Sequence, residues 1–129
     1  MGETAIQKAI LYALEAVPGC VFWRNNTGRM RRRYSVGLGV GSADLIGVVQ
    51  TEIASKLSES GYIASLAFAF GRFAALEIKD PKGKTSPERA ARQKAWRETV
   101  REHGGFAAVV TDVAEALEAV GRCKQGEVR

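Results

Sequence analysis

Two carboxylates and a lysine, set in apolar segments, are the residues of this sequence best suited to chemistry. Asp44 precedes the apolar residues 45–49, and Glu77 and Lys79 close a second apolar segment, residues 73–79. A charge in a buried strand is costly, so it usually has a partner or a task. Two carboxylates can hold a hard divalent cation, and an ammonium group can sit beside a phosphate. This set of groups is typical of metal-dependent phosphodiester hydrolysis.

The spacing of these residues predicts how they converge. Glu77 and Lys79 are two residues apart in a predicted strand, so they point to the same face. Ile78 points the other way, but its backbone carbonyl can turn toward a metal. We expect Asp44, Glu77 and this carbonyl to bind Mg²⁺ or Mn²⁺, while Lys79 orients the attacking water or stabilises developing negative charge. The residues alone leave an equal alternative, a structural ion pair between Glu77 and Lys79.

The composition indicates one intracellular domain with a polyanionic partner. The chain has 129 residues and a net charge of +5, which fits one domain that binds DNA or RNA. Cys20 and Cys123 lie outside any Cys-x-x-Cys pattern, so a zinc site is not expected. Two free thiols favour a reducing, cytoplasmic location. No apolar run reaches the ~18–20 residues that cross a bilayer, so no membrane partner is expected.

Basic side chains are concentrated in two segments. Four arginines occur within residues 29–33, beside Tyr34, and lead toward Asp44. This pattern favours a loop that contacts phosphates, although a solvated loop is the plainer alternative. The second basic segment is a predicted helix that starts after the N-cap Ser86 and ends near His103.

Periodicity predicts a mixed α/β domain with a central sheet flanked by helices. The expected order is a helix over 3–17, strands over 20–25, 43–49 and 73–79, the basic helix, a strand over 106–111 and a last helix capped by Asp112. Residues 50–72 are ambiguous. We interpret 51–58 as a short helix and 62–70 as an extra strand that packs on the core or against a second subunit. Residues 121–129 are expected to form a polar, frayed tail.

The ordered motifs resemble the PD-(D/E)xK nuclease superfamily, and more closely its virus-type replication-repair nuclease (VRR-NUC) branch. The resemblance covers about residues 3–120, with 50–72 as an insertion in a single domain, 1–129. The matching segments are residues 24–28, 41–47, 76–79 and 82–87, Gln93 with Trp96, and 104–106.

The resemblance implies a PD-(D/E)xK restriction-endonuclease-like fold and a Mg²⁺- or Mn²⁺-dependent DNA endonuclease. It adds Glu3 as an acid that completes the metal site, and Gln93 as the helix residue that faces it. Glu3 has a simpler explanation as a first-turn acid favoured by the helix dipole. Small members of this branch resemble phage proteins that act as homodimers on branched DNA such as four-way junctions. The candidate DNA-binding residues are Arg24, Asn25, Arg29, Arg31, Arg32, Arg33, Lys82, Lys84, Arg89 and Arg92.

Two other functions remain open. A non-catalytic DNA-binding module on a nuclease fold would keep the basic segments and need no metal. A restriction-type endonuclease would need a recognition domain, which this short chain does not evidently contain.

Overall fold

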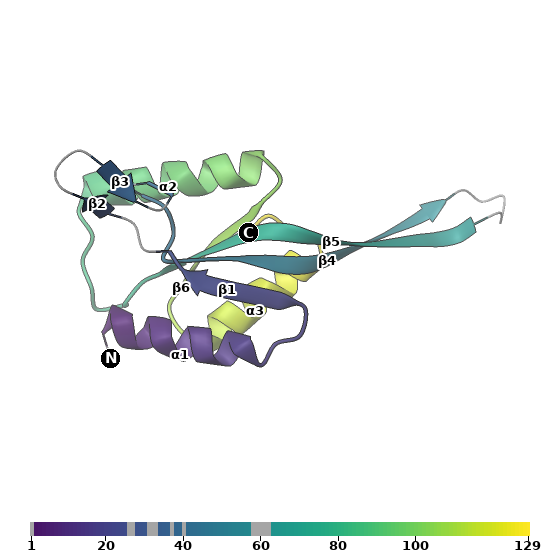
Figure 1. Ribbon diagram of the computed structural model, residues 1–129, viewed down its shortest axis with the longest axis horizontal. Helices are drawn as coiled ribbons and strands as arrows, with labels where there is room; N and C mark the ends of the chain where they lie inside the picture. Colours follow the sequence, from purple (N-terminus) through teal and green to yellow (C-terminus); the bar gives the residue numbers. More distant parts are fainter. Residues whose placement is uncertain (1, 26–27, 31–33, 37, 40, 58–62) are drawn as a thin grey trace.

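A four-stranded mixed sheet with helices on both faces forms the body of the protein (Figure 1). The computed structural model describes residues 2–25, 28–30, 34–36, 38–39, 41–57 and 63–129. The elements run α1 (Glu3–Glu15), β1 (Cys20–Arg24), β2 (Gly28–Met30), β3 (Tyr34–Val36), β4 (Leu45–Leu57), β5 (Ile63–Ile78), α2 (Pro87–Glu102), β6 (Phe106–Val110) and α3 (Val113–Lys124). The predicted α/β class, with a central sheet between helices, is confirmed.

The strand order of the main sheet is β1-β4-β5-β6. β4 pairs antiparallel with both β1 and β5, whereas β6 pairs parallel to β5, and helix α2 makes the crossover between them. Gly47 is required where β1 meets β4, because a Cβ at this position would lie 2.2 Å from the carbonyl oxygen of Val21.

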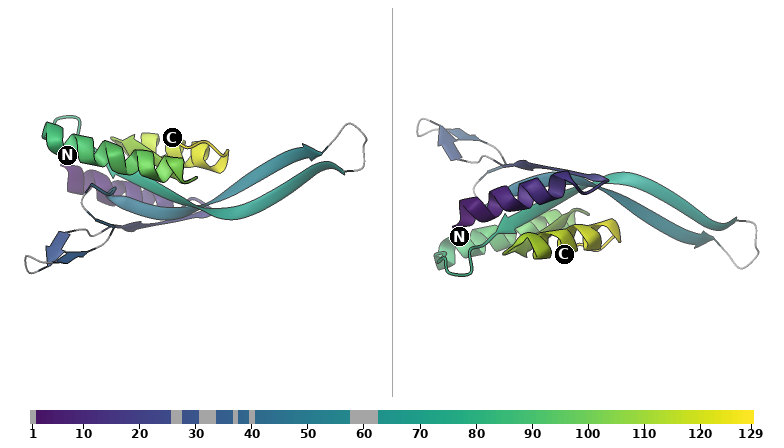
Figure 2. Two further views of the ribbon diagram at one scale, coloured as in Figure 1. Left: turned by 90° about the horizontal axis from the view of Figure 1, so that it is seen from above. Right: turned by 90° about the horizontal axis from the view of Figure 1, so that it is seen from below.

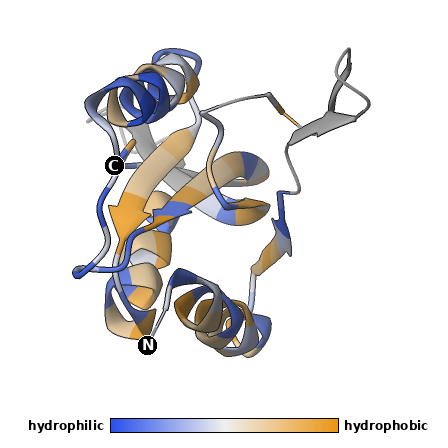
Figure 3. Ribbon diagram, turned by 90° about the vertical axis from the view of Figure 1, so that its left-hand side faces the viewer, coloured by the Kyte–Doolittle hydropathy of each residue, from blue (hydrophilic) through white to orange (hydrophobic). Residues whose placement is uncertain are grey.

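The principal core lies between the sheet and the helices α1 and α3. Ile6, Ile10 and Leu14 of α1 recur at helical spacing and are buried against Leu45 and Leu76 of the sheet. Helix α2 covers the opposite face with a smaller cluster, in which Trp96 and Val100 pack on small residues of the sheet. Figure 3 shows the contrast between the hydrophilic α2 and the apolar strands beneath it.

Residues 50–57 and 63–72 form a long two-stranded arm. β4 and β5 continue past the body as an antiparallel pair of strands, which projects away from the helices (Figure 2). The predicted strand over 62–70 is part of β5, but the predicted helix over 51–58 is wrong, because β4 extends through Leu57. Cross-strand pairing with β5 outweighs the local helix preference here, since each residue from Thr51 to Ser55 has a partner on β5.

Two further expectations need correction. Arg29 and Met30, expected in an arginine loop, lie in β2, which pairs antiparallel with β3, while residues 31–33 of that expected loop lie outside the described residues. The segment after Gly121 is not a frayed tail, because α3 continues to Lys124 and the backbone N–H of Ala107 donates a hydrogen bond to Val128 O at 3.0 Å. One backbone N–H on the free edge of β6 is satisfied in this way. Within the described residues, no helix is long and apolar enough to span a membrane.

Candidate metal centre

The strand register brings Asp44 and Glu77 to the same edge of the sheet. Leu45 pairs with Leu76, so the next position outward sets Asp44 opposite Glu77. Leu76 and Ile78 face the core formed with α1 and α3, and Glu77 points to the other face, where α2 lies. The predicted convergence of two carboxylates from neighbouring strands is therefore present in the structure.

Asp44 is held by backbone contacts on both sides. Its Oδ2 accepts a hydrogen bond from the backbone N–H of Ile78 at 2.8 Å. Its own carbonyl oxygen accepts from Asn25 N at 2.8 Å and from Gln7 Nε2 at 3.4 Å. These contacts fix the carboxylate beside the end of β5.

The loop before Asp44 is tied to both β1 and α2. The Asn25 side-chain amide donates to Ser42 Oγ at 2.8 Å and to Ala43 O at 2.9 Å. Gly41 has a φ of 91°, and a Cβ there would lie 3.0 Å from the carbonyl oxygen of Arg92 on α2. The loop therefore needs glycine both for its backbone conformation and for its close approach to the helix.

Glu77 is the most deeply buried charged group of the site. Its side chain is 2% exposed, and Oε1 accepts a hydrogen bond from Gln93 Nε2 at 2.8 Å and lies 3.4 Å from Lys79 Nζ. Its Oε2 is buried and has no hydrogen-bond partner among the described residues. Such an oxygen is costly unless a proton or a cation compensates it.

The pKa of Glu77 also reflects the cost of its buried negative charge. Burial, followed by the nearby negative charge of Asp44, raises the pKa of Glu77 from 4.5 to about 7. Lys79, and more weakly Arg97, oppose the shift. Burial and the second carboxylate together disfavour the charged form of Glu77 more than Lys79 and Arg97 favour it.

Lys79 and Gln93 complete a small polar network. Lys79 Nζ donates to Gln93 Oε1 at 2.7 Å and to Thr85 Oγ1 at 3.3 Å. The two ends of the Gln93 amide are therefore both used, one by Lys79 and the other by Glu77. Gln93 is 4% exposed, which makes it the one buried residue of α2 among those the structure describes.

The donor set fits a hard divalent cation. Asp44, the unpartnered Glu77 Oε2 and the carbonyl of Ile78 supply oxygen atoms, the ligands that Mg²⁺ and Mn²⁺ prefer. In the described part of the chain, no three His, Cys, Asp or Glu side chains form a metal-binding cluster. Glu3 is exposed in the first turn of α1, which begins at the same end of the molecule as this site (Figure 1). Its predicted role stays a prediction.

The candidate DNA contacts fall into three groups. Exposed basic side chains are Arg24, Lys82, Lys84, Arg89 and Arg92. Asn25 is half-buried, and its amide bonds to the loop before Asp44. Arg31, Arg32 and Arg33 lie outside the described residues, as does the side chain of Arg29.

Sequence reasoning missed three supporting residues. Gln7 reaches the backbone of Asp44, Thr85 contacts Lys79, and the charge of Arg97 acts on Glu77. A signal exists for Arg97, which follows Gln93 by four residues and therefore lies on the same side of α2. Gln7 lies on the same inward side of the first helix as Glu3, and Thr85 lies within the matching segment 82–87, but no local pattern predicts the contact that either residue makes.

A comparison with protein-family models finds no match to this chain, and a search among curated proteins finds none either.

Proposed function

We propose that this protein is a metal-dependent DNA endonuclease with the PD-(D/E)xK fold, of the VRR-NUC type. The observation that carries the proposal is the buried, unpartnered Oε2 of Glu77, opposite Asp44 and beside Lys79. A purely structural ion pair between Glu77 and Lys79 would leave no reason for a second carboxylate in the same place. It would also leave Oε2 uncompensated.

Each residue of the site has a distinct chemical task in this proposal. Asp44, Glu77 and the Ile78 carbonyl would hold Mg²⁺ or Mn²⁺, which lowers the pKa of bound water and neutralises phosphate charge. Lys79 places a positive charge 3.4 Å from Glu77, where it can stabilise an anion or orient the attacking water. Gln93 occupies Oε1 of Glu77 and thereby leaves Oε2 free. Glu3 would join the site as a further acid, as the family resemblance implies.

The proposed substrate is branched DNA such as a four-way junction, cut by a homodimer in the cytoplasm. The net charge of +5 and the exposed lysines and arginines near the site support a polyanionic substrate. The projecting arm supports a second subunit, because an isolated two-stranded hairpin is only marginally stable in water. A two-fold symmetric dimer would match the local symmetry of a junction.

A cleavage panel tests the proposal directly. The full chain is incubated with single-stranded, duplex, flapped and four-way DNA, with Mn²⁺, with Mg²⁺ and with a chelator. We expect cutting of branched DNA only with metal. Glu77→Gln and Lys79→Ala should each lower the rate by roughly 10²-fold or more. Glu102→Gln, which changes an exposed carboxylate at the end of α2, is the matched control and should cut normally.

The same panel separates the rival function. A non-catalytic DNA-binding module would bind these substrates and cut none of them with either metal. A Glu77→Gln variant that cuts at the normal rate would show that the site is assigned wrongly.

A further inference from the structure

The face of the sheet that carries the candidate metal centre is only partly covered. Helix α2 lies over the β5–β6 side of this face, and among the residues that the structure describes no helix packs over β1 and β4 on this side. Four large apolar side chains remain exposed there, Val21 at 45%, Trp23 at 54%, Val48 at 40% and Phe73 at 38%. An exposed apolar patch of this kind marks a binding surface more often than a plain surface.

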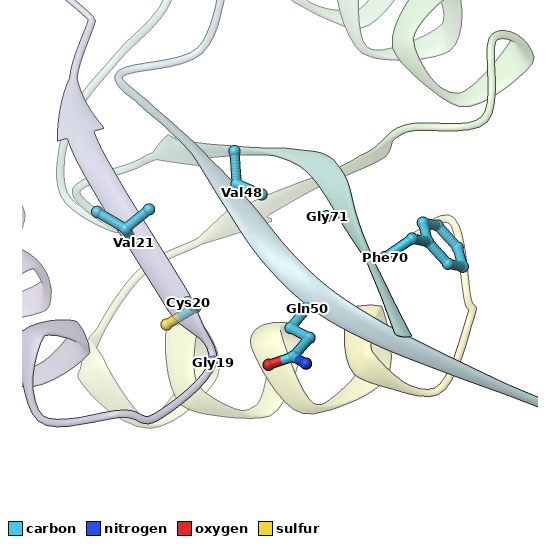
Figure 4. Close-up of a pocket in the computed structure, with 7 residues that line it drawn as sticks. All are labelled: Gly19, Cys20, Val21, Val48, Gln50, Phe70 and Gly71. Carbon is cyan, nitrogen blue, oxygen red and sulfur yellow. The ribbon is translucent and has the colours of Figure 1, made fainter. Parts of the chain in front are cut away.

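The register shows that these side chains form one patch. Val21 pairs with Val48, and Val48 pairs with Phe73, so the three make a row across β1, β4 and β5. Figure 4 shows Val21 and Val48 on adjacent strands, beside a hollow of about 480 Å³ that Phe70 and Gly71 also line. Gly71 makes room for this row, because a Cβ there would lie 2.8 Å from Val48 Cγ1.

Trp23 connects this row to the candidate metal centre. Trp23 pairs with Ile46, and Asp44, immediately before β4, lies two residues from Ile46 and so on the same side. Residues that follow one another on one face of a strand are roughly 6.6 Å apart. The Trp23 indole therefore lies about this distance from the position across the sheet where Asp44 and Glu77 face each other. A ligand on Trp23 is thus a direct neighbour of whatever occupies the metal centre.

The charges around the patch favour a nucleic acid as that ligand. Lys79 lies at the end of the patch that carries the two carboxylates, and the exposed Arg92 of α2 lies against Gly41, in the loop before Asp44. Arg24 pairs with Leu45 and therefore points to the opposite face. An aromatic surface with cations beside it is how proteins bind unpaired nucleotides, since every base has a flat face that can stack.

We infer that the Trp23 patch is a stacking platform for unpaired nucleobases next to the phosphate at the metal centre. This inference rests on the proposed function and sharpens it. The preferred DNA would have single-stranded nucleotides immediately beside the cut, as at an opened junction or a flap. Trp23 would stack on the nearest base, and the row of Val21, Val48 and Phe73 would receive the next one.

Fluorescence tests the platform without any cutting. The chain has two tryptophans, so Trp96→Phe leaves Trp23 as the only one and keeps an aromatic ring against Phe73. The probes, in a chelator, are an oligothymidylate and an abasic deoxyribose-phosphate chain of the same length. We expect the oligothymidylate to quench Trp23 emission and the abasic chain to leave it unchanged. Equal quenching by the two probes, or none by either, would overturn the inference.

Affinity supplies the second measurement. Trp23→Ala should weaken oligothymidylate binding roughly tenfold and leave abasic-chain binding within about twofold, whereas Trp23→Phe should retain most of the affinity. Tyr12→Ala removes another exposed aromatic side chain, on α1 across the sheet, and is the matched control. Unchanged affinity of Trp23→Ala would overturn the platform. So would unchanged DNA affinity together with dissociation of a dimer in sedimentation, because the patch would then be a protein interface.

The outcome is independent of the nuclease activity. If oligothymidylate quenches Trp23 but no DNA is ever cut, the platform stands and the endonuclease proposal fails. If branched DNA is cut but oligothymidylate does not quench Trp23, the endonuclease proposal stands and the platform fails.

Discussion

Gln93 donates a hydrogen bond from Nε2 to Glu77 Oε1 at 2.8 Å, across a separation of 16 residues. Gln93 Oε1 also accepts a hydrogen bond from Lys79 Nζ. Turning the amide over would set its NH₂ group against the Lys79 ammonium and its oxygen against the Glu77 carboxylate, so only one orientation is favourable. Gln93 thus connects α2 to the end of β5 and decides which oxygen of Glu77 stays free. The role of Gln93 is to position Glu77 and Lys79.

Replacement of Gln93 should affect both stability and cutting. Gln93→Ala removes one buried and one partly buried hydrogen bond, so we expect the free energy of unfolding to fall by about 1–3 kcal/mol in urea denaturation. Cutting of branched DNA should slow while DNA affinity is retained, because Glu77 and Lys79 lose their shared support. Gln125→Ala, at an exposed position after α3, is the control and should match the unmodified protein. Full activity of Gln93→Ala would contradict the positioning role.

The raised pKa of Glu77 predicts a specific dependence of stability on pH. The pKa is about 7 in the folded, metal-free protein and 4.5 for an ordinary glutamate, so the folded state binds more protons between these values. The contribution of Glu77 to stability therefore falls as pH rises through this window and is least favourable above pH 7.

Glu77→Gln isolates this contribution, because the glutamine is uncharged throughout. In a chelator, the variant should gain stability relative to the unmodified protein as the pH rises from about 5 to about 8. Urea midpoints at several pH values provide the measurement, and Glu102→Gln should show no such trend. Parallel curves for Glu77→Gln and the unmodified protein would mean that Glu77 titrates normally.

Metal binding should appear as stabilisation of the folded state. At a Mn²⁺ concentration 100 times the dissociation constant, a single site adds about 2.7 kcal/mol. We expect a corresponding rise in melting temperature for the unmodified protein. Asp44→Asn and Glu77→Gln should lose most of this rise, since each removes a charged ligand. A full Mn²⁺ effect in both variants would place the ion elsewhere.

A buried arginine outside the candidate site should contribute to the stability of the fold. Arg72 is 7% exposed and donates from Nε to Gly104 O at 2.8 Å and from its terminal nitrogens to the carbonyls of Gly105 and Glu127. It joins β5 to the turn after α2 and to the segment after α3. Arg72→Leu should lower the free energy of unfolding by about 2–4 kcal/mol, because it leaves these carbonyls unpaired. Lys8→Leu, at an exposed position of α1, should change it little.

The central part of the fold and of the site follows from local patterns. The alternation that places Glu77 and Lys79 on one face is visible in the sequence, and so are the caps of α2 and α3. Ser86 Oγ accepts from Arg89 N, and Asp112 Oδ1 accepts from Glu115 N. These features depend on residues two or three positions apart, which is the range over which side-chain type determines geometry.

The remainder depends on contacts distant in the chain. The extension of β4 through Leu57 is set by its pairing with β5, and no local pattern distinguishes it from a short helix. The roles of Gln7 and Thr85 arise only when α1 and the loop after β5 meet at the sheet edge. Arg72 has a signal that was overlooked, since it shares strand parity with the buried Ala74, Leu76 and Ile78.

The register of the arm has a consequence for how the chain can vary. From Leu45 with Leu76 to Ser55 with Leu66, the pairing of β4 and β5 is unbroken, and its single irregularity lies further out, between Ser55 and Leu57. Insertions or deletions beyond that irregularity change only the length of the arm. The same change nearer the body would slip one strand by a residue and turn one carboxylate to the opposite face. Length variation is therefore tolerated at the outer end and forbidden near the body.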